Sequence, residues 1–438
     1  MPRSDCVRIG APNPRCTTSC RRRRACKMAT GTIPLQVPRN RPLALWIGGL
    51  AALFLVGLFA MGQVLLKGLQ VTGLNDRVPW GLWITQDLSG IGLGAGAFTF
   101  SAAVYLFRIK RLEPMARAAV FIGFLGYTSA MLVLAMDIGR PDRFWHPLVY
   151  WNVHSVLWEI TWCVVLYSAV LVLEVLPVVF ESPFFDRWSW LRAAGHQVHR
   201  LTPILAVVGM ALSLLHQSSL GATYGVLSGR AIWFKPSLPV MFIISAVAGG
   251  VSLTLLATMV TSKLRNRNLI PESIKLELAR FIGYTLLAYL YIKLWDWAAT
   301  SYYSSAPGTA SALARLRATT PYTATFWWVE VVLGGVVPAM ILLYHRFRLN
   351  DQALMAALGL IVVGLIVNRW NVTLSGLVAP PDWSPGILGD VLAATYSPTL
   401  LEITVSLGVL AYGLLGFTLG ARYLPLYTTH PTQTESTV

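Results

Sequence analysis

The sequence predicts an all-α polytopic membrane protein with about ten transmembrane helices and with both termini in the cytoplasm. Only 12% of its 438 residues are charged and 55% are hydrophobic, whereas a soluble domain carries about 25% charged residues. Ten segments are apolar over the length that a helix needs to cross a bilayer. The net charge of +16 follows from basic residues on alternate connections, so it does not indicate a nucleic-acid-binding domain.

The ten predicted spans follow one another with short connections. They are 43–66, 86–107, 116–136, 154–180, 201–220, 238–261, 281–299, 326–344, 353–370 and 399–420. The ninth is the weakest, because Asn368 and Arg369 interrupt it. In the second span, "GIGLGAGAF" (90–98) follows no strand, so its glycines favour close helix packing over a phosphate-binding loop.

The distribution of lysine and arginine predicts the orientation. With the N-terminus inside, the inward side collects 25 of these residues and the outward loops hold 9. The inward excess persists when the first 41 residues are left out. By the positive-inside rule, both termini therefore lie in the cytoplasm.

The chain divides into three parts. Residues 1–41 form a basic tail that we expect to be disordered, residues 42–424 form the membrane domain, and residues 425–438 form a polar tail. Four cysteines of the first part lack the paired spacing of a zinc site; they are Cys6, Cys16, Cys20 and Cys26. The composition of residues 1–27 favours Met28 as the true start of translation.

Ionisable residues of the spans gather at their predicted outward ends. This group consists of Asp87, Asp137, Glu159, His216, Lys293, Asp296, Glu330, Arg369 and Glu402. Glu174 is the comparable residue on the inward half. Ionisable residues at membrane depth generally face a cavity and indicate a proton or substrate path. The alternative, for the stretch "YIKLWDW" (291–297), is that Lys293 and Asp296 neutralise each other across one helical turn.

The tryptophans repeat this asymmetry. Thirteen of the sixteen are predicted to lie on the outward side, whereas aromatic belts normally form at both interfaces. Binding of a planar ring and docking of a partner would both use such a face.

Three alternative functions stay open at this stage. A haem b needs two histidines on facing helices, and His154 and His216 are the two that we expect at membrane depth. A secondary transporter would place its ionisable groups near the midplane of two matching halves. A purely structural anchor would not need so many buried charges.

Five stretches resemble one family of membrane subunits. They are "NDRVPWGLWITQDL" (75–88), "MDIGR" (136–140), "NVHSVLWE" (152–159), "HQSSLG" (216–221) and "FWWVEVVL" (326–333). They are similar to the HybB branch of the NrfD/polysulfide-reductase membrane-subunit family, and the likeness runs from about residue 43 to 424. His154 departs from the family pattern, in which asparagine is usual.

The resemblance implies a haem-free, quinone-reactive subunit in the bacterial inner membrane. Its partner would be a periplasmic iron–sulfur protein, commonly with a nickel–iron hydrogenase, and its substrate menaquinone or ubiquinone. Reducing a quinone takes two electrons and two protons, and buried carboxyl groups can supply protons near neutral pH.

We therefore expect two roles among the outward residues. Proton donors are expected among Asp137, Glu159, His216, Asp296 and Glu330. The remaining lining of a quinone pocket is expected among Asp87, His154, Lys293, Arg369 and Glu402.

Overall fold

The computed structural model describes residues 41–427, apart from 186, 231, 302–321 and 380–393. Within these residues the regular structure is helical, and the one β-bridge joins Asn75 to Val78. The all-α prediction is therefore confirmed. The cysteine-containing tail and Met28 lie outside the described residues, as do Arg315, Arg317 and Trp383.

Long helices follow the predicted spans closely. They are α1 (Arg41–Lys67), α2 (Leu82–Leu106), α3 (Glu113–Asp137), α5 (Val156–Phe180), α6 (Ser189–Gly225), α7 (Leu238–Arg265), α8 (Glu272–Ser301), α13 (Asp351–Val378) and α14 (Leu400–Tyr423). The eighth span is a composite of α10 (Tyr322–Ala324), the π-helix η5 (Thr325–Val336) and α11 (Val337–Leu343).

Short helices occupy the connections. They are the 3₁₀ turns η1 (Leu69–Val71), η2 (Lys110–Leu112), η3 (Pro141–Arg143) and η4 (Pro183–Phe185), and the single-turn helices α4 (His146–Val149) and α12 (His345–Arg348).

Nine helices of the described residues are long and apolar enough to cross a membrane. The span at Asp351–Val378 is among them, so the expectation that the ninth span is the weakest was wrong. The segment that falls short is α8, although it has 30 residues. Its tyrosines, its tryptophans and the charged Lys293 and Asp296 lower its mean hydropathy.

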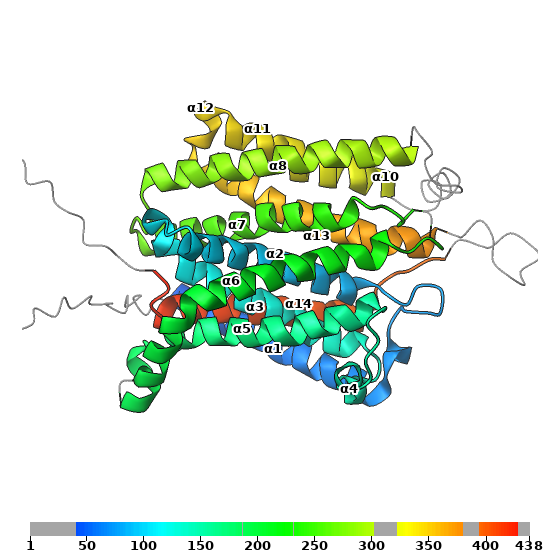
Figure 1. The fold of residues 1–438 in the computed structure, drawn as a ribbon, viewed down its shortest axis with the longest axis horizontal. Helices are drawn as coiled ribbons and strands as arrows, with labels where there is room; N and C mark the ends of the chain where they lie inside the picture. Colours follow the sequence, from blue (N-terminus) through cyan, green and yellow to red (C-terminus); the bar gives the residue numbers. More distant parts are fainter. Residues whose placement is uncertain (1–40, 186, 231, 302–321, 380–393, 428–438) are drawn as a thin grey trace, which may run out of the picture. The chain divides into compact units, whose positions relative to one another are not determined.

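α2 lies at the centre of the bundle, between α3 and α7 (Figure 1). A Cβ atom on Gly94 would lie 2.9 Å from the carbonyl oxygen of Gly123 on α3, and one on Gly90 would lie as close to that of Gly126. On another face of α2, Gly96 contacts the backbone of Ala246 and Gly250 on α7. The packing role predicted for the glycine-rich stretch is confirmed, because side chains at these positions would force the helices apart.

Ionisable side chains lie mainly toward one end of this bundle, which we call the charged end. Here α3 ends at Asp137, α8 carries Lys293 and Asp296 in its last turns, and α14 begins beside Glu402. In Figure 1 it is the right-hand end, where α4 and α10 are labelled.

Among the helices that continue past their predicted ends, α6 and α13 change the place of a candidate residue. α6 reaches Gly225, so His216 lies inside it rather than at its end. α13 reaches Val378, so Arg369 is also interior. Polar residues lead a sequence-based prediction to end a span early, but both side chains are hydrogen-bonded inside the bundle and the backbone continues as helix.

Candidate functional site

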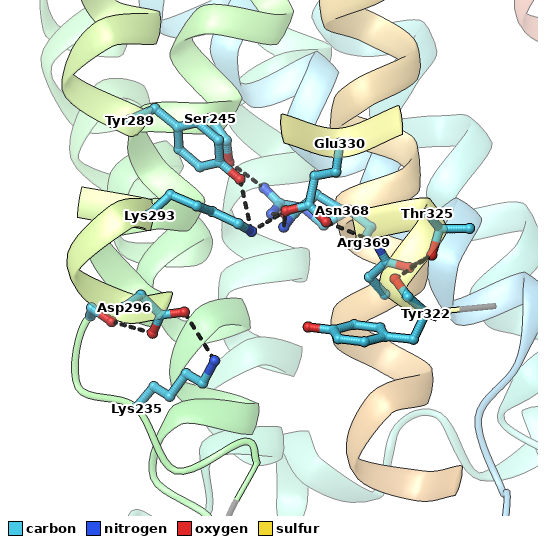
Figure 2. Close-up of polar contacts among 12 residues, drawn as sticks. Lys235, Ser245, Tyr289, Lys293, Asp296, Tyr322, Thr325, Glu330, Asn368 and Arg369 are labelled. Atoms are coloured by element: carbon cyan, nitrogen blue, oxygen red, sulfur yellow. Dashed lines mark hydrogen bonds and ion pairs between the residues drawn. The ribbon is translucent and has the colours of Figure 1, made fainter. Parts of the chain in front are cut away.

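Lys293 and Asp296 lie one turn apart on α8, yet each has its ion-pair partner on another element. Lys293 pairs with Glu330 of η5. Asp296 accepts hydrogen bonds from Lys235 Nζ at 2.9 Å and from Ser237 Oγ at 3.2 Å, both in the loop before α7. Figure 2 shows the two side chains reaching toward these different partners. Lys293 and Asp296 are therefore each neutralised by a residue of another element and not by each other.

The Glu330 carboxylate accepts hydrogen bonds from three side chains. Besides Lys293, the side-chain amides of Asn368 and Asn371 each donate to it at 2.8 Å. Asn368 and Asn371 come from α13, so the carboxylate joins η5, α8 and α13. Glu330 lies on the π-helix η5. Such helices are rare, and they are frequently found at functional sites.

Arg369 belongs to the same network. Its Nη1 donates to Asn368 Oδ1 at 2.7 Å and its Nη2 donates to Ser245 Oγ of α7 at 2.9 Å. Its guanidinium also lies over the ring of Phe242, 3.6 Å from the centroid. We call Lys293, Glu330, Asn368 and Arg369 the ion-pair cluster; all four are more than nine-tenths buried.

A cleft opens beside the ion-pair cluster at the charged end. Its inner part, about 420 Å³ counting the open mouth, is lined by Lys293, Glu330 and Trp233 among others. Its outer part, about 430 Å³ by the same measure, is lined by residues of α8 and of the segment that begins at Tyr322. Lys235, Asp296 and Phe326 line both parts, so they form one continuous cleft.

A second polar group lies in the other half of the bundle, on α2, α3 and α6. Asp87 of α2 lies in the neighbourhood of Asp137 and Tyr127 of α3. The Tyr127 hydroxyl lies 2.7 Å from His216 Nδ1. We call Asp87, Tyr127, Asp137 and His216 the acid–histidine cluster.

Polar atoms of the acid–histidine cluster have unused hydrogen-bonding capacity. Asp87 Oδ1, Asp137 Oδ1 and His216 Nε2 are buried and have no hydrogen-bond partner. Both amide atoms of Gln217, the residue after His216, are in the same state. Because buried polar groups are normally paired, such a concentration indicates a place for water or for a polar ligand.

Glu159 and Glu402, also predicted as site residues, have hydrogen-bond partners outside these two clusters. Glu159 of α5 accepts a hydrogen bond from Ser219 Oγ of α6 at 2.7 Å. His154 lies in the exposed loop before α5, two residues before the helix begins at Val156. The span was predicted to start too early there, because the aromatic residues around His154 resemble the beginning of an apolar helix.

Glu402 has a structural role. It completes the capping box of α14 with Thr399 and accepts hydrogen bonds from Gly73 N at 2.8 Å and Tyr396 Oη at 2.6 Å. Burial, and then the hydrogen bond to Glu402, raise the pKa of the Tyr396 phenol above its usual range, so this phenol stays a donor. Glu402 therefore fixes the loop before α2 to the start of α14.

Three residues of these networks were not predicted from the sequence as site residues. Tyr127 is one aromatic residue in an apolar span, and nothing in the sequence indicates its contact with His216. Lys235 falls in a loop, where a lysine is ordinary. Asn371 carried a weak signal, since it follows Asn368 at helical spacing in a span.

The family model of polysulphide reductase, NrfD, matches residues 70–381. The chain is 34% identical, over 87% of its length and 91% of the relative's, to the menaquinone reductase integral membrane subunit of Nitratidesulfovibrio vulgaris.

Two further relatives differ in the enzymes that their names describe. The probable Ni/Fe-hydrogenase 2 b-type cytochrome subunit of Escherichia coli is 27% identical, over 81% of the present sequence and 85% of the relative. The Hdr-like menaquinol oxidoreductase integral membrane subunit of Archaeoglobus fulgidus is 25% identical, over 86% and 92%.

Proposed function

Because this chain belongs to the polysulphide reductase NrfD family, we propose that it is the quinone-reactive membrane subunit of an oxidoreductase complex. One observation supports most directly where the quinone ring binds: the buried, unpartnered polar atoms of the acid–histidine cluster. The name of the Nitratidesulfovibrio relative favours menaquinone as the substrate.

The acid–histidine cluster suits the hydrogen bonding of a quinone. The two carbonyl oxygens of the ring are acceptors and need donors. When the Tyr127 hydroxyl donates to His216 Nδ1, the neutral imidazole carries its proton on Nε2, the atom without a partner. His216 then donates to one carbonyl oxygen and stabilises the negative charge that develops there.

Two electrons and two protons convert the two carbonyl groups of a quinone to hydroxyl groups. We assign proton delivery to Asp87 and Asp137, because one carboxyl oxygen of each is buried and has no hydrogen-bond partner in the described residues. The electrons come from a partner subunit, which we propose to be a periplasmic iron–sulfur protein of a hydrogenase or related reductase docked at the charged end. Oxidation of a quinol would reverse each transfer.

The ion-pair cluster suits proton delivery less well. The carboxylate oxygens of Glu330 already accept hydrogen bonds from a lysine and two asparagines, so they are occupied by protein groups. Asp296 is likewise paired with Lys235. Proton donation by Asp296 stays a prediction, and Asp296→Asn tests it in the assay described next.

The test compares two activities of the purified complex carrying Asp87→Asn or His216→Gln. Quinone reduction should fall by about ten- to a hundredfold, as expected when general acid catalysis is lost. Reduction of an artificial dye at the partner's own site should stay at the parental rate.

Glu174→Gln is the matched control. Glu174 is also a buried carboxyl group, but it lies in the last turns of α5, toward the end of the bundle opposite the charged end. It should leave both activities unchanged. Parental quinone reduction in both of the other variants, in complexes that assemble normally, would refute the proposed site.

A further inference from the structure

Two hydrogen-bond donors in the wall of the cleft have no partner. They are Trp297 Nε1 and Ser301 Oγ, which are buried and lie one turn apart on α8. Both residues line the outer part of the cleft, together with Lys235. A ligand with acceptor oxygens can therefore accept hydrogen bonds from both of these donors.

Aromatic rings enclose the same space. Phe326 and Trp327 line the outer part. The Trp297 and Trp327 rings meet edge to face, with centroids 5.6 Å apart. Such a surface accepts a flat apolar ring, and in combination with the donors it selects a planar molecule with carbonyl oxygens.

The cleft is separate from the acid–histidine cluster. Its lining comes from α8, the eighth span, α13, the start of α7 and the loop before it, whereas the cluster lies on α2, α3 and α6. Aromatic side chains stand between them: Trp233 lines the cleft and packs against Tyr224, with centroids 4.9 Å apart. Tyr224 in turn lies near Asp87 and Asp137.

We propose that the cleft is a second quinone-binding site, which holds the ring without protonating it. The identity of the ligand rests on the function proposed above. Trp297, Ser301 and Lys235 provide hydrogen bonds to carbonyl oxygen. In this proposal the carboxylates at the cleft, Asp296 and Glu330, stay in their ion pairs with Lys235 and Lys293, so a loss of quinone reduction in Asp296→Asn would contradict it. The second molecule is therefore bound in reserve or in exchange with the membrane.

Binding stoichiometry tests this inference. The intact complex, stripped of its native quinone, is titrated with a short-chain ubiquinone and with a short-chain menaquinone analogue. Two molecules of the better ligand should bind per subunit. The double variant Trp297→Phe with Ser301→Ala keeps the ring packing but removes both donors, so affinity at one of the two sites should fall about tenfold or more. His216→Gln should weaken the other site.

Trp295→Phe is the control, because Trp295 lies on the same helix but is 53% exposed. Both sites should keep their parental affinity in this variant. Binding of a single molecule per subunit, or two sites that both survive the double variant unchanged, would overturn the inference while leaving the proposed function standing. Absence of any quinone binding would instead refute the proposed function. As a second measurement, a photoreactive azidoquinone should label the stretch 322–327 in the parental complex and not in the double variant.

Discussion

Lys293 on α8 and Glu330 on η5 form a buried ion pair although Asp296, also an acid, lies one turn from Lys293 on its own helix. Their side chains are only 8% and 2% exposed. Removing one member of such a pair leaves a buried charge uncompensated, and the cost is typically about 3–5 kcal/mol.

Lys293→Met should therefore lower the thermal stability of the purified protein markedly, and Lys293→Met combined with Glu330→Leu should recover much of the loss. Thermal unfolding in detergent measures both. Arg140→Gln breaks the fully exposed pair with Asp142 and should cause no measurable change. A double variant as unstable as the single one would show that the cluster depends on Glu330 itself.

Tyr127→Phe should lower kcat for quinone reduction about tenfold, because it removes the hydroxyl that faces His216 Nδ1 and so frees the imidazole to take either tautomer. The ring packing is kept, and dye reduction should not change. Tyr412→Phe is the matched control: its hydroxyl lies 3.0 Å from Thr128 Oγ1, one residue further along α3. Equal effects of the two substitutions would mean that Tyr127 acts only through packing.

Reporter fusions test the orientation. Fusions after residues 75, 145, 230, 310 and 385 should report the periplasm, and fusions near 112, 190, 268 and 349 should report the cytoplasm. Because α8 is the long helix of the described residues that falls short of a membrane span, the pair at 268 and 310 is the most informative. A reversed result at any internal pair would contradict the predicted topology.

Starting translation at Met28 removes seven arginines, one lysine and one aspartate and lowers the net charge from +16 to +9. The loops keep their inward excess of positive charge, so insertion and activity should not change. Membrane fractionation and the quinone assay measure these two properties. Loss of assembly would assign a function to the arginines or cysteines of the tail.

One relative is named as a b-type cytochrome subunit. Absorbance spectroscopy of the purified subunit tests whether this chain also binds haem b. We expect no reduced-minus-oxidised haem b absorbance from this subunit. Of the two histidines considered as axial ligands, His154 lies in an exposed loop and His216 faces Tyr127. A stoichiometric b-type spectrum that disappears on replacing His216 would establish the cytochrome alternative.

The amino-acid sequence predicts the helical membrane architecture, because apolar length is a property of each segment alone. It also determined that ionisable groups gather toward one end, since depth follows from position within a span. It placed Glu330 and Lys293 at that end without any knowledge of their contacts.

Which of these groups contact one another depends on how the helices pack. Lys293 has an acid at helical spacing on its own helix, yet its partner comes from a helix 37 positions along the sequence. Likewise, no periodicity in α3 indicates that Tyr127 faces His216 of α6. A local pattern fixes the face of a helix on which a side chain lies, but its partner depends on how the helices pack. That packing is set by contacts between distant residues, such as the glycines of α2 and α3.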